Sequence, residues 1–147
     1  MNQYINLNVH SNFTTYETVI TPEEIVEKAV KDGASAVALT DKNSVGGFMQ
    51  LSRAADKHKD KGFKPIYGVQ INCLIEKDNP ALITLLVKNQ TGLRNMYKII
   101  TTGYMNLEEI DSWPCVSRQD VENNRKGLLV GMELQWESLC GAGSSEL

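Results

Sequence analysis

The chain has 147 residues, of which 41% are apolar and 22% charged, and its formal net charge is −3. This balance is typical of a single globular domain, which at this length buries about 68–70% of the surface that its unfolded chain exposes. The small negative charge excludes a domain whose whole surface attracts nucleic acid, so any contact with DNA must be local or indirect.

The cysteines and the apolar stretches bear on the compartment. Cys73, Cys115 and Cys140 are odd in number and widely spaced, so they predict neither a disulfide framework nor a zinc knuckle. No apolar stretch approaches 18 residues, and Met1–Val9 lacks the layout of a signal peptide. We expect a cytoplasmic protein with reduced, buried thiols and no membrane span.

The first quarter of the chain predicts strand, helix and strand. Tyr4–Val9 has the large and β-branched residues of a strand, and Ala36–Thr40 is an apolar run typical of a buried parallel strand. Between them, Thr21–Glu24 combines an N-cap, a first-turn proline and a capping-box glutamate. Gly33 suits the end of the helix that these residues begin.

The rest of the chain continues the alternation. The expected elements are a helix over Phe48–Lys61 that ends near Gly62, strands over Lys64–Ile75 and Ala81–Val87, a helix from about Thr91, a helix that begins at Ser117–Asp120, and a strand over Gly127–Met132. This order predicts an α/β fold with a largely parallel sheet. Residues 105–114 fit no element. We expect one domain over residues 1–140, and the small, polar end at 141–147 is typical of a flexible tail or of a segment within a longer chain.

Functional groups in an α/β fold gather in the loops that follow the carboxyl ends of strands. That rule selects four segments here: Asn8–His10, Asp41–Asn43, Gly68–Gln70 and the loop after Val87. We expect these segments to meet at one end of the sheet. Their residue types are poor for catalysis, because none of them matches a phosphate loop or a nucleophile elbow.

Metal binding requires more ligands than these segments supply. A hydrolytic zinc or manganese cluster needs several histidines and carboxylates, and the chain has two histidines. His58 lies among lysines at an expected helix end and is predicted to be a structural or surface residue. His10 and Glu17 could hold one weakly bound ion, which the positive charge of Lys42 would oppose. We expect no cofactor, or at most a weakly bound zinc or manganese.

Two segments carry alternatives from other classes. Lys88–Gly92 could offer backbone N–H groups to an anion, although such a segment is more often a turn that caps a helix. A lysine cluster could contact a phosphate backbone, although Asp56 and Asp60 dilute its charge. The members of the cluster are Lys57, Lys59, Lys61 and Lys64.

Taken in order, these segments resemble the polymerase-and-histidinol-phosphatase (PHP) domain of bacterial DNA polymerase III alpha subunits. The matching motifs between Tyr4 and Val130 are Asn8–His10 with Thr14, Thr15 and Glu17, Gly33 with Ala36–Lys42, Gly47-Phe48, Pro65–Gln70, Leu85–Lys98 and Arg125–Gly131. The second half is most similar to the PolC type, with the DnaE type as a near alternative. PolC-type members carry an exonuclease inserted where this chain has only Glu76–Pro80.

The resemblance implies a fold and a set of ligand positions. The fold is a distorted seven-stranded βα barrel, of which this chain supplies a partial or abbreviated version with an open edge. Metal-binding members use both histidines of His-x-His, the histidine of Thr-Asp-His and the glutamate of Tyr-Gly-x-Glu. At those positions this chain has Asn8, His10, Lys42 and Gln70.

We therefore expect a degenerate, non-catalytic PHP domain that gives structural support or contacts partners in DNA replication. The vestigial pocket consists of Asn8, His10, Glu17, Asp41, Lys42 and Gln70. The resemblance implies that the parent protein is a DNA-directed DNA polymerase, a nucleotidyltransferase. The expected partners are the remainder of that subunit or replisome proteins, an oligomer partner over the open edge, and DNA only indirectly. Two alternatives stay open: a residual phosphoesterase or proofreading nuclease that uses His10, Glu17 and Asp41, and a local nucleic-acid-binding module.

Overall fold

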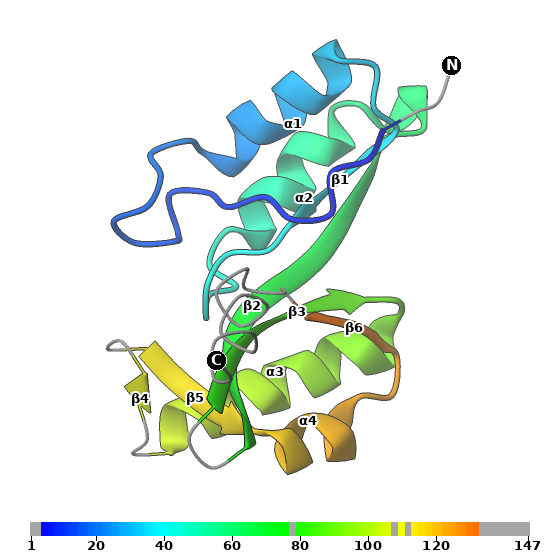
Figure 1. Cartoon of the computed structure of the whole chain (residues 1–147). Coiled ribbons are helices and arrows are strands. Elements are labelled where there is room, and N and C mark those ends of the chain that lie inside the picture. The colour runs from blue at the N-terminus through cyan, green and yellow to red at the C-terminus, as the bar shows by residue number, and fades with distance from the viewer. Residues whose placement is uncertain (1–3, 77–78, 107–108, 111–112, 133–147) are drawn as a thin grey trace, which may run out of the picture.

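The computed structural model describes residues 4–76, 79–106, 109–110 and 113–132. In chain order its elements are α1 (Pro22–Lys31), β1 (Ala36–Leu39), α2 (Phe48–Asp56), the short 3₁₀ helix η1 (Lys59–Lys61), β2 (Lys64–Glu76), β3 (Asn79–Val87), α3 (Gln90–Met105), β4 (Glu109–Ile110), β5 (Trp113–Ser117), α4 (Arg118–Asn124) and β6 (Leu128–Met132). Figure 1 shows β2 as a long strand that runs through both halves of the molecule. The helices α1 and α2 lie beside its first half, and α3 and α4 lie beside its second half.

The strands form one mixed sheet in the order β4-β5-β2-β3-β6, and β1 pairs with the beginning of β2. The predicted α/β class is confirmed, and the expected parallel pairing is found where β1 and β5 meet β2. The pairs β2–β3, β3–β6 and β4–β5 are antiparallel. The connection from β2 to β3 is too short for a crossover, so these two strands can only form a hairpin.

The segment Tyr4–Val9 is not a regular strand, contrary to the prediction. It does lie beside β1, because the N–H of Ala38 donates to the carbonyl of Asn6 at 3.0 Å and that of Thr40 donates to Val9 at 2.8 Å. No strand in the described part of the chain pairs with its far side, and Tyr4 is 79% exposed. The N–H of Val9 donates to the Thr40 hydroxyl at 3.0 Å and that of Asn8 to Asn6 Oδ1 at 3.1 Å, so side chains take the place of a regular backbone ladder here.

The helix α1 confirms the predicted start and stop signals. The hydroxyl of Thr21 accepts a bond from the N–H of Glu24 at 3.3 Å, and the Glu24 carboxylate accepts one from the Thr21 N–H at 2.8 Å. These reciprocal bonds form the capping box. Gly33 has a φ of +78°, which suits the residue after the C-cap.

The second helix is shorter than predicted. It ends at Asp56, and the separate turn η1 precedes Gly62, whose φ is +74°. The buried side chains of α2 are Phe48, Leu51, Ala54 and Ala55. Residues 56–62 include no aliphatic or aromatic apolar residue that could pack against the sheet, and packing is what stabilises a short helix.

The core lies between the helices and β1, β2 and β3. Its fully buried side chains include Leu39, Leu51, Val69, Ile71, Leu85, Met96 and Ile99. The region 105–114, which fitted no predicted element, contains the end of α3, β4 and the beginning of β5. The predicted tail at 141–147 lies outside the described residues. In the described ranges, no helix combines the length and the apolar character needed to cross a bilayer.

Candidate functional site

Three of the four predicted loop segments meet beyond the carboxyl end of β1. The N–H of Asn43 donates to the backbone carbonyl of Gln70 at 2.7 Å, and the N–H of Gln70 donates to the backbone carbonyl of Asp41 at 3.1 Å. These two bonds continue the parallel pairing of β1 and β2. The N-terminal segment joins them where the Thr40 hydroxyl donates to Asn8 Oδ1 at 2.7 Å. This convergence confirms the expectation that these segments share one end of the sheet.

The fourth segment, after Val87, lies elsewhere because β3 runs antiparallel to β2 and ends toward the opposite side. There the N–H of Lys88 donates to the carbonyl of Gly127 at 2.9 Å. The Asn89 side chain accepts a bond from the N–H of Gly92 at 3.0 Å and caps α3. This geometry favours the capping role over the anion site.

The buried carboxylate of Asp41 binds the loop that follows His10. Its side chain is 1% exposed and accepts bonds from the Ser11 N–H at 2.5 Å, the Ser11 hydroxyl at 2.8 Å and the Thr14 hydroxyl at 2.9 Å. Sequence reasoning did not single out Ser11, although a buried aspartate needs such donors and two small hydroxyl residues follow His10 closely. Because these bonds engage both carboxylate oxygens, Asp41 holds the loop and is not a free ligand.

Glu17 joins the two remaining polar side chains of the pocket. One of its oxygens accepts a hydrogen bond from the Lys42 ammonium, and the other lies 3.4 Å from Nδ1 of His10. The hydrogen bond from Lys42 holds the pKa of the Glu17 carboxyl below its ordinary value; the charges of Lys42 and His10 add to this, and partial burial opposes it. The side chains of His10 and Lys42 are 22% and 25% exposed, so water reaches all three groups in part.

Gln70 is as deeply buried as Asp41. Its side chain is 1% exposed, its amide nitrogen donates to the Thr84 hydroxyl at 3.4 Å, and its Oε1 has no hydrogen-bond partner among the described residues. The same holds for Nε2 of His10 and for Oδ1 of Asn43; Asn43 lies in a predicted loop segment but was not placed in the predicted vestigial pocket. A buried polar atom without a partner costs about 1–3 kcal/mol.

The donor set does not fit the metal cluster that the family resemblance implies. Among the described residues, no three histidine, cysteine or acidic side chains are grouped so that they could hold an ion. An ammonium about 4 Å from a divalent cation opposes it by about 8 kcal/mol at an effective dielectric constant of about 20, which cancels one carboxylate at the same distance. Lys42 thus offsets Glu17, and Asp41 is already bonded to Ser11 and Thr14.

The other candidate groups have structural partners. Nε2 of His58 lies 3.0 Å from Glu27 on α1, its ring packs edge-on against Phe63, and its side chain is 14% exposed. The Lys57 ammonium forms an ion pair with Glu23. Both pairs connect the residues just after α2 to α1. Lys57 is therefore paired with a carboxylate, while the other lysines of the predicted cluster are exposed.

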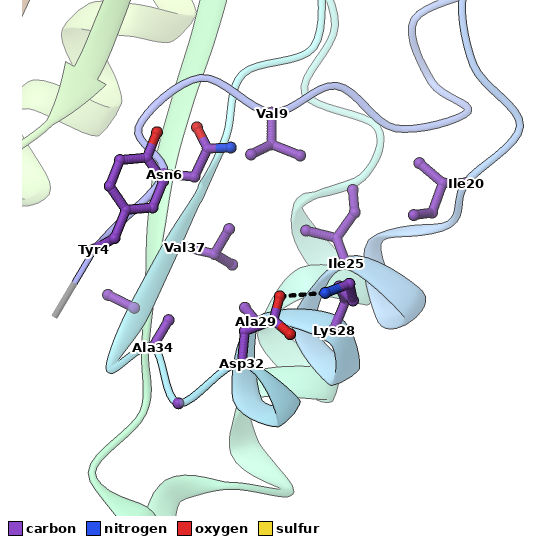
Figure 2. Close-up of a pocket in the computed structure, with 12 residues that line it drawn as sticks. Tyr4, Asn6, Val9, Ile20, Ile25, Lys28, Ala29, Asp32, Ala34 and Val37 are labelled. Atoms are coloured by element: carbon purple, nitrogen blue, oxygen red, sulfur yellow. Dashed lines mark hydrogen bonds and ion pairs between the residues drawn. The ribbon is translucent and has the colours of Figure 1, made fainter.

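A pocket of about 510 Å³ lies between the N-terminal segment, α1 and β1, as Figure 2 shows. Apolar side chains such as Val9, Ile25 and Val37 line much of it, and its charged groups, Lys28 and Asp32, form an ion pair with each other. Its charged groups are therefore paired with each other, and the pocket offers mainly apolar packing space.

Comparison with known proteins relates the whole chain to one family. A family model described as PHP domain matches residues 6–144. DNA polymerase III subunit alpha of Rickettsia bellii is 30% identical over 129 residues, and that of Buchnera aphidicola subsp. Schizaphis graminum is 27% identical over 132 residues. These matches cover 87% and 88% of this chain and 11% of each relative, so the chain spans about a tenth of their length.

Two solved structures share the fold. A putative metal-dependent phosphoesterase from Bifidobacterium adolescentis has a TM-score of 0.55 and 16% identity over 99% of this chain and 46% of its own. An amidohydrolase from Chromobacterium violaceum has a TM-score of 0.53 and 22% identity over 69% of this chain and 33% of its own. Identity this low shows the fold alone, and the site must be judged from its own residues.

Proposed function

The chain belongs to the PHP domain family, and from this membership we propose that it is a non-catalytic PHP module of a protein of the DNA polymerase III alpha type. In this proposal it supports a larger chain that works in DNA replication and performs no phosphoester chemistry itself. The observation that carries the proposal is the ion pair between Lys42 and Glu17, which puts an ammonium at a position where the family resemblance implies a histidine in metal-binding members.

The bonding of the other pocket side chains supports the same conclusion. Asn8 accepts a bond from Thr40, which directly follows β1, and Gln70 donates one to Thr84 on β3. Each of these side chains stands at an expected ligand position and instead connects two segments of the fold. A pocket that uses its polar groups in this way stabilises the loops around it.

The exposed apolar surface of β6 supports the proposal that this domain is part of a larger chain. Leu129, Val130 and Met132 are 54%, 48% and 54% exposed, which is unusual for three apolar residues within one strand. The curated relatives are far longer than this chain. We propose that further parts of a polymerase III alpha chain cover this strand.

Metal analysis of the purified chain tests the proposal. After incubation with zinc or manganese and desalting, we expect less than stoichiometric metal and no phosphodiesterase turnover. His10→Ala and His58→Ala form a matched pair of variants, because these are the two histidines of the chain. Stoichiometric metal that His10→Ala removes and His58→Ala leaves, together with turnover, would refute the non-catalytic assignment in favour of the residual phosphoesterase.

A further inference from the structure

The backbone of Lys42 is fixed beside the pocket, and its ammonium binds Glu17. The N–H of Lys42 donates to the Thr14 hydroxyl at 3.1 Å, and residue 42 forms a parallel bridge with Gln70. The neighbouring Asp41 is almost completely buried. The Lys42 side chain is 25% exposed, so packing already restricts its rotamers, and it loses less conformational freedom on binding a carboxylate than a lysine on an open surface does.

The pocket has one carboxylate, that of Glu17, that needs a positive counter-charge, and the Lys42 ammonium supplies it. Asp41 is satisfied by hydroxyl and backbone donors, so Glu17 is the carboxylate that still needs a counter-charge. Its two oxygens face Lys42 on one side and His10 on the other. A carboxylate that bridges a cation and an imidazole in this way would be suited to bridge a metal ion and one of its ligands.

We propose that the Lys42 ammonium is the resident cation of this pocket, which takes the place of a metal ion and makes the fold of the two loops independent of any metal. This inference rests on the proposed non-catalytic function and extends it. It assigns Lys42 as a positioning residue, which orders the Glu17 loop against the loop after β1, and it predicts that removing the ammonium creates a demand for an external cation.

A double-mutant cycle measures the coupling between the two charges. Lys42→Met, Glu17→Gln and the double variant are compared by urea unfolding, and we expect a coupling of about fivefold in the folding equilibrium constant. The exposed pair Lys57 and Glu23, with side chains 57% and 55% exposed, is the matched control. Its cycle of Lys57→Met and Glu23→Gln should show about twofold coupling or less. Equal coupling in the two cycles would overturn the special role of Lys42.

Addition of a divalent cation separates this inference from the proposed function. With manganese added, the melting temperature of the wild-type chain should not change, that of Lys42→Met should rise, and that of the Lys42→Met/Glu17→Gln double variant should stay constant. If Lys42→Met neither loses stability nor responds to manganese, the resident-cation role is wrong and the non-catalytic assignment stands. A manganese-dependent rise in the wild type contradicts the resident-cation role, and phosphodiesterase turnover that accompanies it and that His10→Ala abolishes contradicts the non-catalytic assignment as well.

Discussion

Two regions of the chain that resemble the same family are built on different principles. In the pocket after β1, side chains bind one another across loops, as Lys42 and Glu17 do. At the glycine junction, which we define as Asn89, Gly92 and Gly127, the backbone of α3 packs directly against the turn before β6. A Cβ atom on Gly92 would lie 1.9 Å from the carbonyl oxygen of Gly127.

The difference shows that some positions are restricted by the space around the backbone and others by the hydrogen bonds and charges of neighbouring side chains. At the Gly92 and Gly127 positions the junction admits only glycine, because no side chain fits between two backbones in contact. The pocket admits any set of side chains that satisfies its hydrogen bonds and its charge, and an ammonium beside a carboxylate is one such set. The fold of the framework can therefore stand while the chemistry of the pocket changes, and the predictions below test this separation.

The largest effect is expected at the junction. Gly92→Ala forces backbone apart, so we expect a loss of about 3 kcal/mol or more in the free energy of unfolding, or failure to fold. Gly131→Ala is the matched control, because its Cβ would come no closer than 3.9 Å to its nearest neighbour, the carbonyl oxygen of Thr84. Urea unfolding followed by circular dichroism measures both. Similar stabilities of the two variants would contradict the shape argument.

A loss nearly as large is expected inside the pocket. Asp41→Ala leaves the Ser11 N–H and the hydroxyls of Ser11 and Thr14 without their buried acceptor, and bonds to a charged group are worth about 1.5–3 kcal/mol. We expect about 3 kcal/mol less stability. The exposed Asp56→Ala should change stability by about 0.5 kcal/mol or less. A mild effect at Asp41 would mean that the loop is held by other contacts.

Much of the framework was predictable from local signals, and the pairing within the pocket was not. Thr21 and Gly33 mark the limits of α1 because capping and positive φ are properties of short segments. The antiparallel course of β3 was missed, although the short link after Glu76 was visible. The contact between Glu17 and Lys42 spans 25 residues, and nothing in the local sequence specifies where two loop side chains meet.

An effect of intermediate size concerns the core along β2. Cys73 is 3% exposed, and burial, with a smaller contribution from Cys115, raises the pKa of its thiol from 9.0 to about 11. The folded chain therefore holds this proton more tightly than the unfolded chain. The resulting stability is full below pH 9 and is lost as the pH rises toward 11, with about 1.4 kcal/mol gone by pH 10.

The pH dependence of Cys73→Ala isolates this contribution. The stability difference between wild type and Cys73→Ala should shrink between pH 8 and pH 10, because the stabilisation from the Cys73 proton is lost over this range and all other groups are common to the two proteins. Urea unfolding at each pH measures the difference. A constant difference across this range would mean that the thiolate is tolerated in the folded core.

The smallest effect concerns the helix N-caps, because the same capping box occurs in each half of the molecule and the two can be compared directly. Thr21 begins α1 near the pocket, Ser117 begins α4 in the other half, and both form capping boxes. Replacing either residue by alanine should cost about 1 kcal/mol, whereas Thr21→Ser and Ser117→Thr should be nearly neutral. Caps depend on backbone shape, so equal losses are expected although the pocket and the junction differ. If Thr21→Ala costs several times more than Ser117→Ala, local order near the pocket depends on its side-chain network, and shape and chemistry are not separable there.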